Sequence, residues 1–347
     1  MNARPSKLAR TLGVLPLVLA GSLAICPVHA DPVADFYRGR TLTVVSAGEA
    51  GGAHGTYAQV ITAHIRRHIP GTPGVVIQHM VGAGGNLAAN YLYNVAPKDG
   101  SVIGVPLQDL IVNARLGVSA VKYDATKAHY LGGADVTRTT VTVMKSSGVT
   151  SLDEARRREV LIGASGKSGQ NYTIPVVLNA VIGTRFRIVT GYPGINVIHL
   201  AMDRGEVHGS AASWAVIAST RREWIEGKRI TNLVTIGSER DPQIPDVPAL
   251  GELATGEGDR VLIGLMAAPA ALGRAWVAFG DIPTERLAAL RAAFAATLAD
   301  PQFKAEAAAR GLGLEPVTWQ AQQALAGQIL ATPDATVARL KRILELD

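Results

Sequence analysis

The feature that most constrains the fold of this chain is a recurring order of β-branched strand, glycine-rich run and amphipathic helix. Segments rich in Val, Ile and Thr, such as TLTVVSA (41–47) and VVIQHM (75–80), are each followed by a glycine run. The glycine runs lead into segments with apolar residues at helical spacing, such as 56–69. Strands that alternate with helices are typical of a mainly parallel sheet with covering helices. The sequence therefore predicts an α/β fold.

The pattern occurs in two blocks. The first block contains the strands above, a third at 101–106 and a helix at 87–96 that begins after Asn86 as its N-cap. The second block has one helix that opens on Ser151, another around 174–182 and a third that ends near Gly205. Its predicted strands are 139–145, 159–165, 186–192, 207–213 and 230–237. A mostly helical tail follows, so the sequence predicts two α/β units.

The N-terminus has the pattern of a secretory signal peptide. Three basic residues precede a short apolar segment at 12–25, and Val28-His29-Ala30 places small residues before a cleavage site. Cleavage after Ala30 would remove residues 1–30, including Cys26, the single cysteine of the chain. A lipoprotein anchored at Cys26 is the alternative, although Ile25 stands where a lipobox has a small residue. We expect an exported protein that folds without a disulfide bond.

The charge pattern argues against a nucleic-acid partner. The chain carries a net charge of +6, and three of its basic residues lie in the signal segment, which contains no acidic residue. The densest basic runs, 156–158 and 221–222, both adjoin acidic residues. Such mixed runs are typical of a solvated helix face.

Three glycine runs lie at strand-to-helix junctions: GEAGGAHG (48–55), GAGGN (82–86) and GASGKSG (163–169). In a parallel sheet these junctions meet at the carboxyl edge, where ligands bind. The free N–H groups of a helix N-terminus favour an anion, and glycine lets the backbone approach it closely. One interpretation is therefore a carboxylate or phosphate site built from several loops. Ordinary tight turns are the other.

Motifs for nucleotides and for catalysis are incomplete. Leu87 replaces the third glycine of a dinucleotide fingerprint, and Leu161 replaces the first glycine of a P-loop. Lys167 replaces the second glycine of a nucleophile elbow around Ser165. His64 and His68 have a spacing that can bind zinc, but no glutamate follows His64. We expect no cofactor and no metal; a secreted α/β hydrolase or transferase using Ser165 with a histidine stays as the alternative function.

The order of these motifs resembles the substrate-binding receptors of tripartite tricarboxylate transporters, the TctC or Bug family. The resemblance rests on GAGGN followed by AANYLYNVAPKDG, and on GASGKSG, TGYPG (190–194), LAMDRGEVHG and DPQIPDVP (241–248). It covers the whole chain after the signal segment. It implies a non-catalytic, two-lobed periplasmic binding protein of the type II-like, Venus-flytrap kind, with a mainly parallel sheet and covering helices in each lobe. Lobe 1 would comprise 31–134 plus 266–347, and lobe 2 135–265.

The resemblance also implies a ligand and partners. The receptor would be a periplasmic monomer that closes on a small organic acid and delivers it to the membrane permease subunits of the transporter. Carried over from the family, the ligand contacts are Gly51, Gly52, Ala53, His54, Gly55, Gly82, Ala83, Gly84, Gly85, Ala164, Ser165, Gly166, Lys167, Ser168 and Gly169.

The first loop departs from the family pattern. Relatives usually have an aspartate at the position of Gly55 and often an aromatic residue at that of His54. The loss of the aspartate removes a negative group and is expected to open space, and it makes an amino-acid ligand doubtful. Whether His54 and Lys167 contact the ligand stays open: each is either a ligand contact or a solvent-facing residue.

Overall fold

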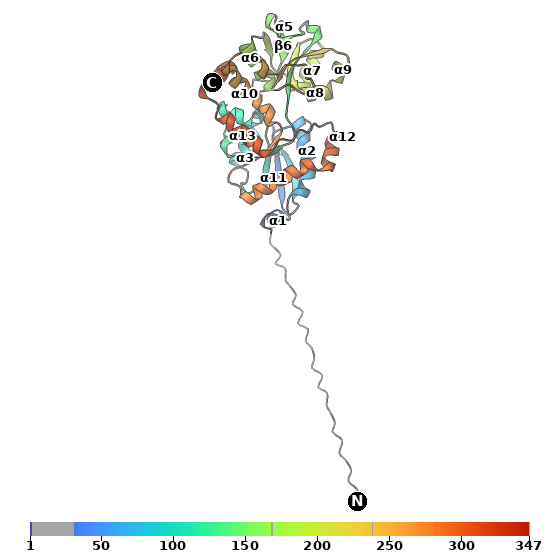
Figure 1. The fold of residues 1–347 in the computed structure, drawn as a ribbon, viewed down its shortest axis with the longest axis vertical. Coiled ribbons are helices and arrows are strands. Elements are labelled where there is room, and N and C mark those ends of the chain that lie inside the picture. Colours follow the sequence, from blue (N-terminus) through green and yellow to red (C-terminus); the bar gives the residue numbers. More distant parts are fainter. Residues whose placement is uncertain (2–30, 168, 238, 347) are drawn as a thin grey trace. The chain divides into compact units, whose positions relative to one another are not determined.

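The computed structural model describes Met1 and residues 31–167, 169–237 and 239–346 (Figure 1). The predicted signal peptide and Cys26 lie outside the described residues, apart from Met1. No helix in the described ranges is both long and apolar enough to cross a membrane.

The first of two five-stranded sheets is built from both ends of the sequence. Its strands in spatial order are β2 (Gly74–His79), β1 (Thr41–Ser46), β3 (Val102–Val105), β10 (Ala275–Phe279) and β4 (Ala128–Gly133). β1 pairs in parallel with β2 and β3, with Val44 opposite Ile77 on one side and Ile103 on the other. β10 is antiparallel to both of its neighbours, so the other four strands run in one direction.

The second sheet repeats this arrangement with the middle of the sequence. Its order is β7 (Phe186–Val189), β6 (Val160–Gly163), β8 (Gly209–Ser213), β5 (Thr139–Met144) and β9 (Ile230–Ile236). β6 is parallel to β7 and β8, and β5 is antiparallel to β8 and β9. The expectation of two α/β lobes with mainly parallel sheets is confirmed, with one reversed strand in each sheet.

The reversed strand is in each case the first strand after the chain changes sheets. The chain leaves the first sheet at β4 and enters the second at β5. It returns through the helix α10 (Glu257–Leu272), which leads directly into β10. The two crossing segments pair through Ala134 N–H to Arg274 O and Arg274 N–H to Asp135 O.

Helices cover both faces of each sheet (Figure 1). One face of the first sheet packs against α1 (Pro32–Tyr37), α2 (Ala53–Ile65), α11 (Thr284–Ala299) and α12 (Pro301–Ala309), and the other against α3 (Asn86–Asn94), α4 (Leu110–Arg115) and α13 (Trp319–Leu330). The second sheet packs against α5 (Leu152–Arg157), α6 (Gln170–Ile182) and α10 on one face, and against α7 (Ile195–Asp203), α8 (Trp214–Thr220) and α9 (Arg222–Glu226) on the other. The last helix, α14 (Asp334–Leu344), contacts α6 and α10. Short 3-10 turns lie at Arg66–His68, Ala83–Gly85, Ala125–Lys127, Lys145–Ser147 and Leu250–Leu253.

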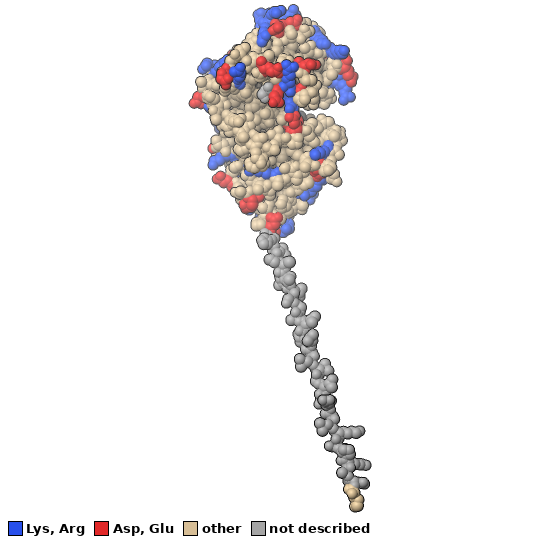
Figure 2. Space-filling model, in the orientation of Figure 1, with Lys and Arg blue, Asp and Glu red and all other residues tan. Residues whose placement is uncertain are grey.

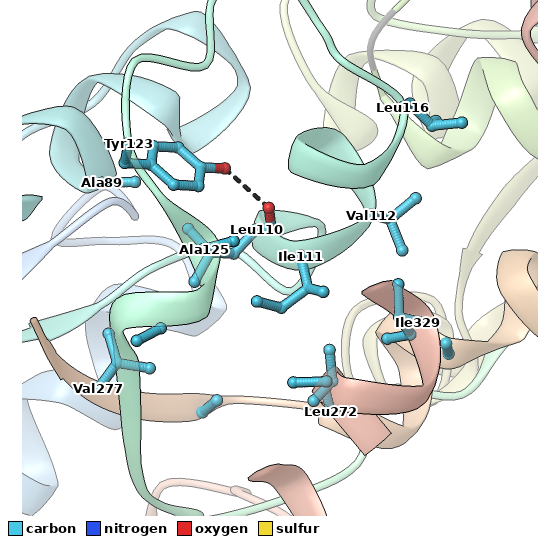
Figure 3. Close-up of a cluster of buried hydrophobic side chains, with 14 of the residues drawn as sticks. Ala89, Leu110, Ile111, Val112, Leu116, Tyr123, Ala125, Leu272, Val277 and Ile329 are labelled. Carbon is cyan, nitrogen blue, oxygen red and sulfur yellow. Dashed lines mark hydrogen bonds between the residues drawn. The ribbon is translucent and has the colours of Figure 1, made fainter. Parts of the chain in front are cut away.

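The core follows from the period-two alternation of the strands. Val44 is buried against the α2 face of the first sheet and Val45 against the α3 face, because successive side chains point to opposite faces. Figure 3 shows part of the hydrophobic cluster on the α3 face, which contains Val45. In this cluster the buried hydroxyl of Tyr123 donates to Leu110 O at 2.7 Å. Val177 of α6 joins this cluster, so the hydrophobic core runs from one sheet's helices to the other's.

Two predicted helix starts were tested. Ser151 is the N-cap of α5, and its hydroxyl accepts the Glu154 N–H at 3.2 Å, as predicted. The prediction for Asn86 was wrong by one residue: Gly85 is the N-cap of α3, and the buried Asn86 side chain donates back to Ala83 O. The left-handed backbone of Gly85 explains the difference, because it already turns the chain into the helix.

Candidate ligand-binding site

The glycine runs at 48–55 and 82–86 lie side by side at the carboxyl edge of the first sheet. They follow β1 and β2, and a third loop follows β3. The His79 ring contacts Gly48 O at 2.7 Å, which ties the end of β2 to the first run. A Cβ at Gly85 would lie 2.8 Å from the Leu107 side chain, so the second run packs directly on the loop after β3. The three loops are therefore linked by contacts between neighbours.

The second run is glycine-rich because of its backbone conformation. Gly82, Ala83, Gly84 and Gly85 all have positive φ angles, between 48° and 148°. Side chains disfavour this region, so glycine at three of the four positions lowers the strain. The run turns the chain sharply and presents the first turn of α3, whose N–H groups have no acceptor within the helix.

The first run needs glycine for packing. A Cβ at Gly55 would lie 1.9 Å from Glu49 O and 2.9 Å from Ala50 Cα. The expectation that the missing aspartate opens space here was therefore wrong: the loop's own backbone fills the place of any side chain at Gly55. Gly51, in contrast, has open space around it.

His54 lies in the first turn of α2 and is half-buried. Its Nε2 atom is buried and has no hydrogen-bond partner among the described residues. Burial and the nearby guanidinium of Arg274 lower the pKa of His54 to about 3. The imidazole is thus neutral at physiological pH and adds no positive charge to the site.

The third run connects β6 to α6. Its Ser165 is exposed, and the hydroxyl exchanges hydrogen bonds with the Asn171 side chain at 3.2–3.3 Å. An amide has no proton that titrates near neutral pH, so this contact supplies no general base. Lys167 is exposed and pairs with Glu345 at 3.2 Å, which raises the pKa of the lysine. Ser168 lies outside the described residues.

The two sheets' loops meet at a contact between side chains that the sequence analysis did not single out. Gln170, the first residue of α6, donates through Nε2 to Asp109 Oδ1 at 3.2 Å. Thr139, at the start of β5, donates to Gln170 Oε1 at 3.3 Å. We call the glycine runs together with these three residues the loop site. Asp109 stands at the third strand-to-helix junction of the first sheet, four residues after the end of β3, and this position is the signal that could have identified it.

A buried ion pair joins the two crossing segments. Arg274 Nη1 lies 2.6 Å from Asp135 Oδ2, and its guanidinium stacks on the Tyr57 ring at 4.2 Å. The Tyr57 hydroxyl contacts the same carboxylate at 3.1 Å. Beside it, Arg138 pairs with both carboxylate oxygens of Glu315. Both arginine charges are thus matched within the crossing region.

A separate cavity of about 700 Å³ lies next to the crossing segments. It is lined by α10, α13, the end of β9 and the Arg138–Glu315 pair, and by none of the glycine-run residues. Gly264 of α10 contributes to its wall, with open space around the position of a Cβ.

The loop site contains three helix starts and no cluster of metal ligands among the described residues. α2, α3 and α6 begin at these glycine runs without a side-chain cap, and a helix N-terminus carries about half a positive charge. No cluster of three metal-ligating side chains occurs within the described part of the chain. His64 contacts Glu306 at 2.7 Å, whereas His68 contacts Asp300 at 3.0 Å, so the two histidines have different carboxylate partners. Figure 2 shows acidic and basic side chains interspersed on the visible face, as expected for a solvated surface.

Comparison with known proteins bears on the fold. No protein-family model matches the chain, and a search of curated proteins finds no match. Among solved structures, the chain is similar to a TctC solute-binding protein from Polaromonas, with a TM-score of 0.66, 15% identity, and coverage of 89% of this chain and 99% of that one. It is similar to an R. palustris protein solved with adipate, with a TM-score of 0.65, 21% identity, and coverage of 88% and 97%. It is also similar to MatC from Rhodopseudomonas palustris with bound malate, with a TM-score of 0.61, 20% identity, and coverage of 88% and 99%. The chain therefore has the two-lobed α/β fold of periplasmic solute-binding proteins such as TctC.

Proposed function

We propose that this chain is a periplasmic solute-binding protein that captures a small organic acid at the loop site. The observation that supports the proposal is the Asp109–Gln170 contact, which joins the loop after β3 to the start of α6, together with the glycine-rich starts of α2, α3 and α6 in the two sheets. Free N–H groups at helix starts are suited to a carboxylate, and they need no cationic side chain. The similar R. palustris structures contain adipate and malate, which supports an organic acid here.

The finer parts of the proposal follow the family resemblance. The lobes would comprise 31–134 plus 266–347 and 135–265, and they would close on the ligand by bending at the crossing segments. The ligand contacts would be the fifteen glycine-run residues named above, with backbone amides as the main donors. A cleaved signal peptide would deliver the monomer to the periplasm. The permease subunits of a tripartite tricarboxylate-type transporter would receive the acid.

Isothermal titration tests the binding role. Purified protein would be titrated with succinate, malate, adipate, citrate, benzoate and amino acids. We expect acids of one chemical class in this panel to bind, with one ligand per protein molecule. If folded protein binds none of them at millimolar concentration, the proposal is wrong.

Two serine variants test whether the ligand contacts Ser165. Ser165→Ala should weaken binding by about tenfold or more, because a hydrogen bond to a charged group contributes roughly 1.5–3 kcal/mol. Ser219→Ala is the matched control, since Ser219 is exposed on α8 and its hydroxyl bonds to Val216 O of its own helix. Equal affinities of both variants and the wild type would show that the Ser165 hydroxyl does not contact the ligand.

A further inference from the structure

Asp109 holds an unusual position for a carboxylate at the start of a helix. It is the N-cap residue of α4, where an aspartate commonly accepts an N–H of its own helix. No such capping bond forms. Its side chain accepts from Gln170 of the other sheet's helix α6 instead, and Gln170 is held in place by Thr139. The carboxylate is therefore directed to the place where the loops of the two sheets meet.

The described surroundings leave this carboxylate without a cation. Its hydrogen-bond partner is a neutral amide at 3.2 Å. The neighbouring Tyr123 hydroxyl is occupied elsewhere, since it donates to Leu110 O, as Figure 3 shows. Burial raises the pKa of Asp109 to about 6, while the Gln170 hydrogen bond lowers it. The group is still mostly ionised at neutral pH, and one of its oxygens has capacity for further donors.

Two basic side chains near the loop site already have acidic partners. Lys167 pairs with Glu345, and Arg274 pairs with Asp135. Burying an ionised carboxylate is unfavourable unless it receives charge-assisted hydrogen bonds. A ligand that brought a donor to Asp109 would supply them.

We infer that Asp109 makes the loop site selective for acids that carry a hydrogen-bond donor, an ammonium or a hydroxyl, at the end remote from the carboxylate. This inference rests on the proposed function, because the helix N-termini would hold the ligand's carboxylate. It adds that a second carboxylate on the ligand is disfavoured. Two like charges at short range repel strongly when water is excluded, whereas an ammonium is attracted there.

Ligands of equal length that differ in one end group test this selectivity. The four-carbon set is butyrate, 4-hydroxybutyrate, 4-aminobutyrate and succinate, and the six-carbon set is hexanoate, 6-hydroxyhexanoate, 6-aminohexanoate and adipate. Titration calorimetry at pH 7.5 would measure each affinity. In the set that fits, we expect the amino or hydroxy acid to bind at least about tenfold more tightly than the diacid. The ratio of amino acid to hydroxy acid then tells whether the preferred donor is charged.

Asp109→Asn is the diagnostic variant. It keeps the shape of the side chain and removes its charge, so the preference for the amino acid over the diacid should fall by about tenfold or more. Glu206→Gln removes the same charge at an exposed residue between α7 and β8 and should leave the preference unchanged. If Asp109→Asn does not fold, the wild-type ratios alone decide.

The possible failures are distinguishable. A wild-type protein that binds the diacid as tightly as the amino and hydroxy acids overturns this inference and leaves the proposed function standing. So does an Asp109→Asn variant with unchanged ratios. If folded protein binds no acid of either set and none of the wider panel, the proposed function fails, and this inference fails with it.

Discussion

At the scale of single residues, His199 is a buried side chain whose protonation should affect stability. It is fully buried in α7 and packs edge-on against the Trp224 ring at 5.0 Å. Neither ring nitrogen has a hydrogen-bond partner among the described residues. Burial, and then the Arg221 guanidinium, lower the pKa of His199 to about 4. Free imidazole titrates near 6.5, so the folded and unfolded states take up this proton at different pH.

Stability should therefore fall as the pH is lowered from about 6.5 to about 4. In that window the unfolded chain binds a proton at His199 that the folded chain does not, which favours unfolding. His199→Phe keeps the ring contact and removes the titration. We expect it to lessen the loss of unfolding free energy between pH 7 and pH 4.5 by on the order of 2 kcal/mol. Urea denaturation at the two pH values measures this, and His54, whose pKa is lowered to about 3, should sustain part of the wild-type dependence.

An unchanged pH dependence in His199→Phe would show that the ring is protonated, or reaches water, in the folded state. The variant should also be more stable than the wild type at pH 7, because it removes buried polar atoms without partners.

The sequence was least informative about the contacts and roles of single residues. The sequence identified the glycine runs as loops at helix starts, but it did not show why each position requires glycine. Gly85 has a left-handed backbone, whereas Gly55 is packed against Glu49 O. Asp109 and Gln170 were missed because each became significant only through a partner 61 positions away. A single sequence carries no signal for such a contact. The ligand-contact role of the glycine-run residues stays a prediction.

At the scale of elements, the sequence was most informative where local pattern and packing agree. Strands of alternating β-branched residues, such as β1 and β5, were predicted to within a residue or two, as was the capped start of α5. β4, β10 and α10 were missed. β10 is AWVAF, which is buried along its whole length, and a fully buried strand has no polar and apolar alternation to reveal it. α10 contains Pro269 and two glycines, which weaken a helical pattern.

The start of α2 offers a direct test of the first glycine run. Gly55→Ala places a methyl group within 2 Å of Glu49 O, so the loop must move away from the helix. We expect a loss of about 2 kcal/mol or more in unfolding free energy, together with weaker acid binding. Gly51→Ala is the matched control in the same loop, because its methyl group meets nothing within 4 Å, and it should change stability by less than about 0.5 kcal/mol. Urea denaturation of the two variants checks both values, and equal stabilities would mean that the loop is not packed on α2.

At the scale of the whole molecule, the two five-stranded sheets have the same topology. Each has three adjacent parallel strands, then one reversed strand that begins just after the chain crosses over, and then a fourth strand that runs in the direction of the first three. This arrangement could be predicted only as two α/β units, since the reversed strands depend on how the crossing segments enter each sheet. The crossing segments are the shared element, and the Asp135–Arg274 pair lies on them.

That pair should therefore couple strongly in a double-mutant cycle. Arg274 and Asp135 are almost completely buried, and Tyr57 contacts both. Removing either partner leaves an unmatched buried charge, so Asp135→Asn and Arg274→Met should each cost roughly 3 kcal/mol. The double variant has no unmatched charge, and its loss should be smaller than the sum of the single losses by about 1–2 kcal/mol. Chemical denaturation of the four proteins measures the coupling. Losses that add to within about 0.5 kcal/mol would show that the two side chains act independently, and the expected coupling would be wrong.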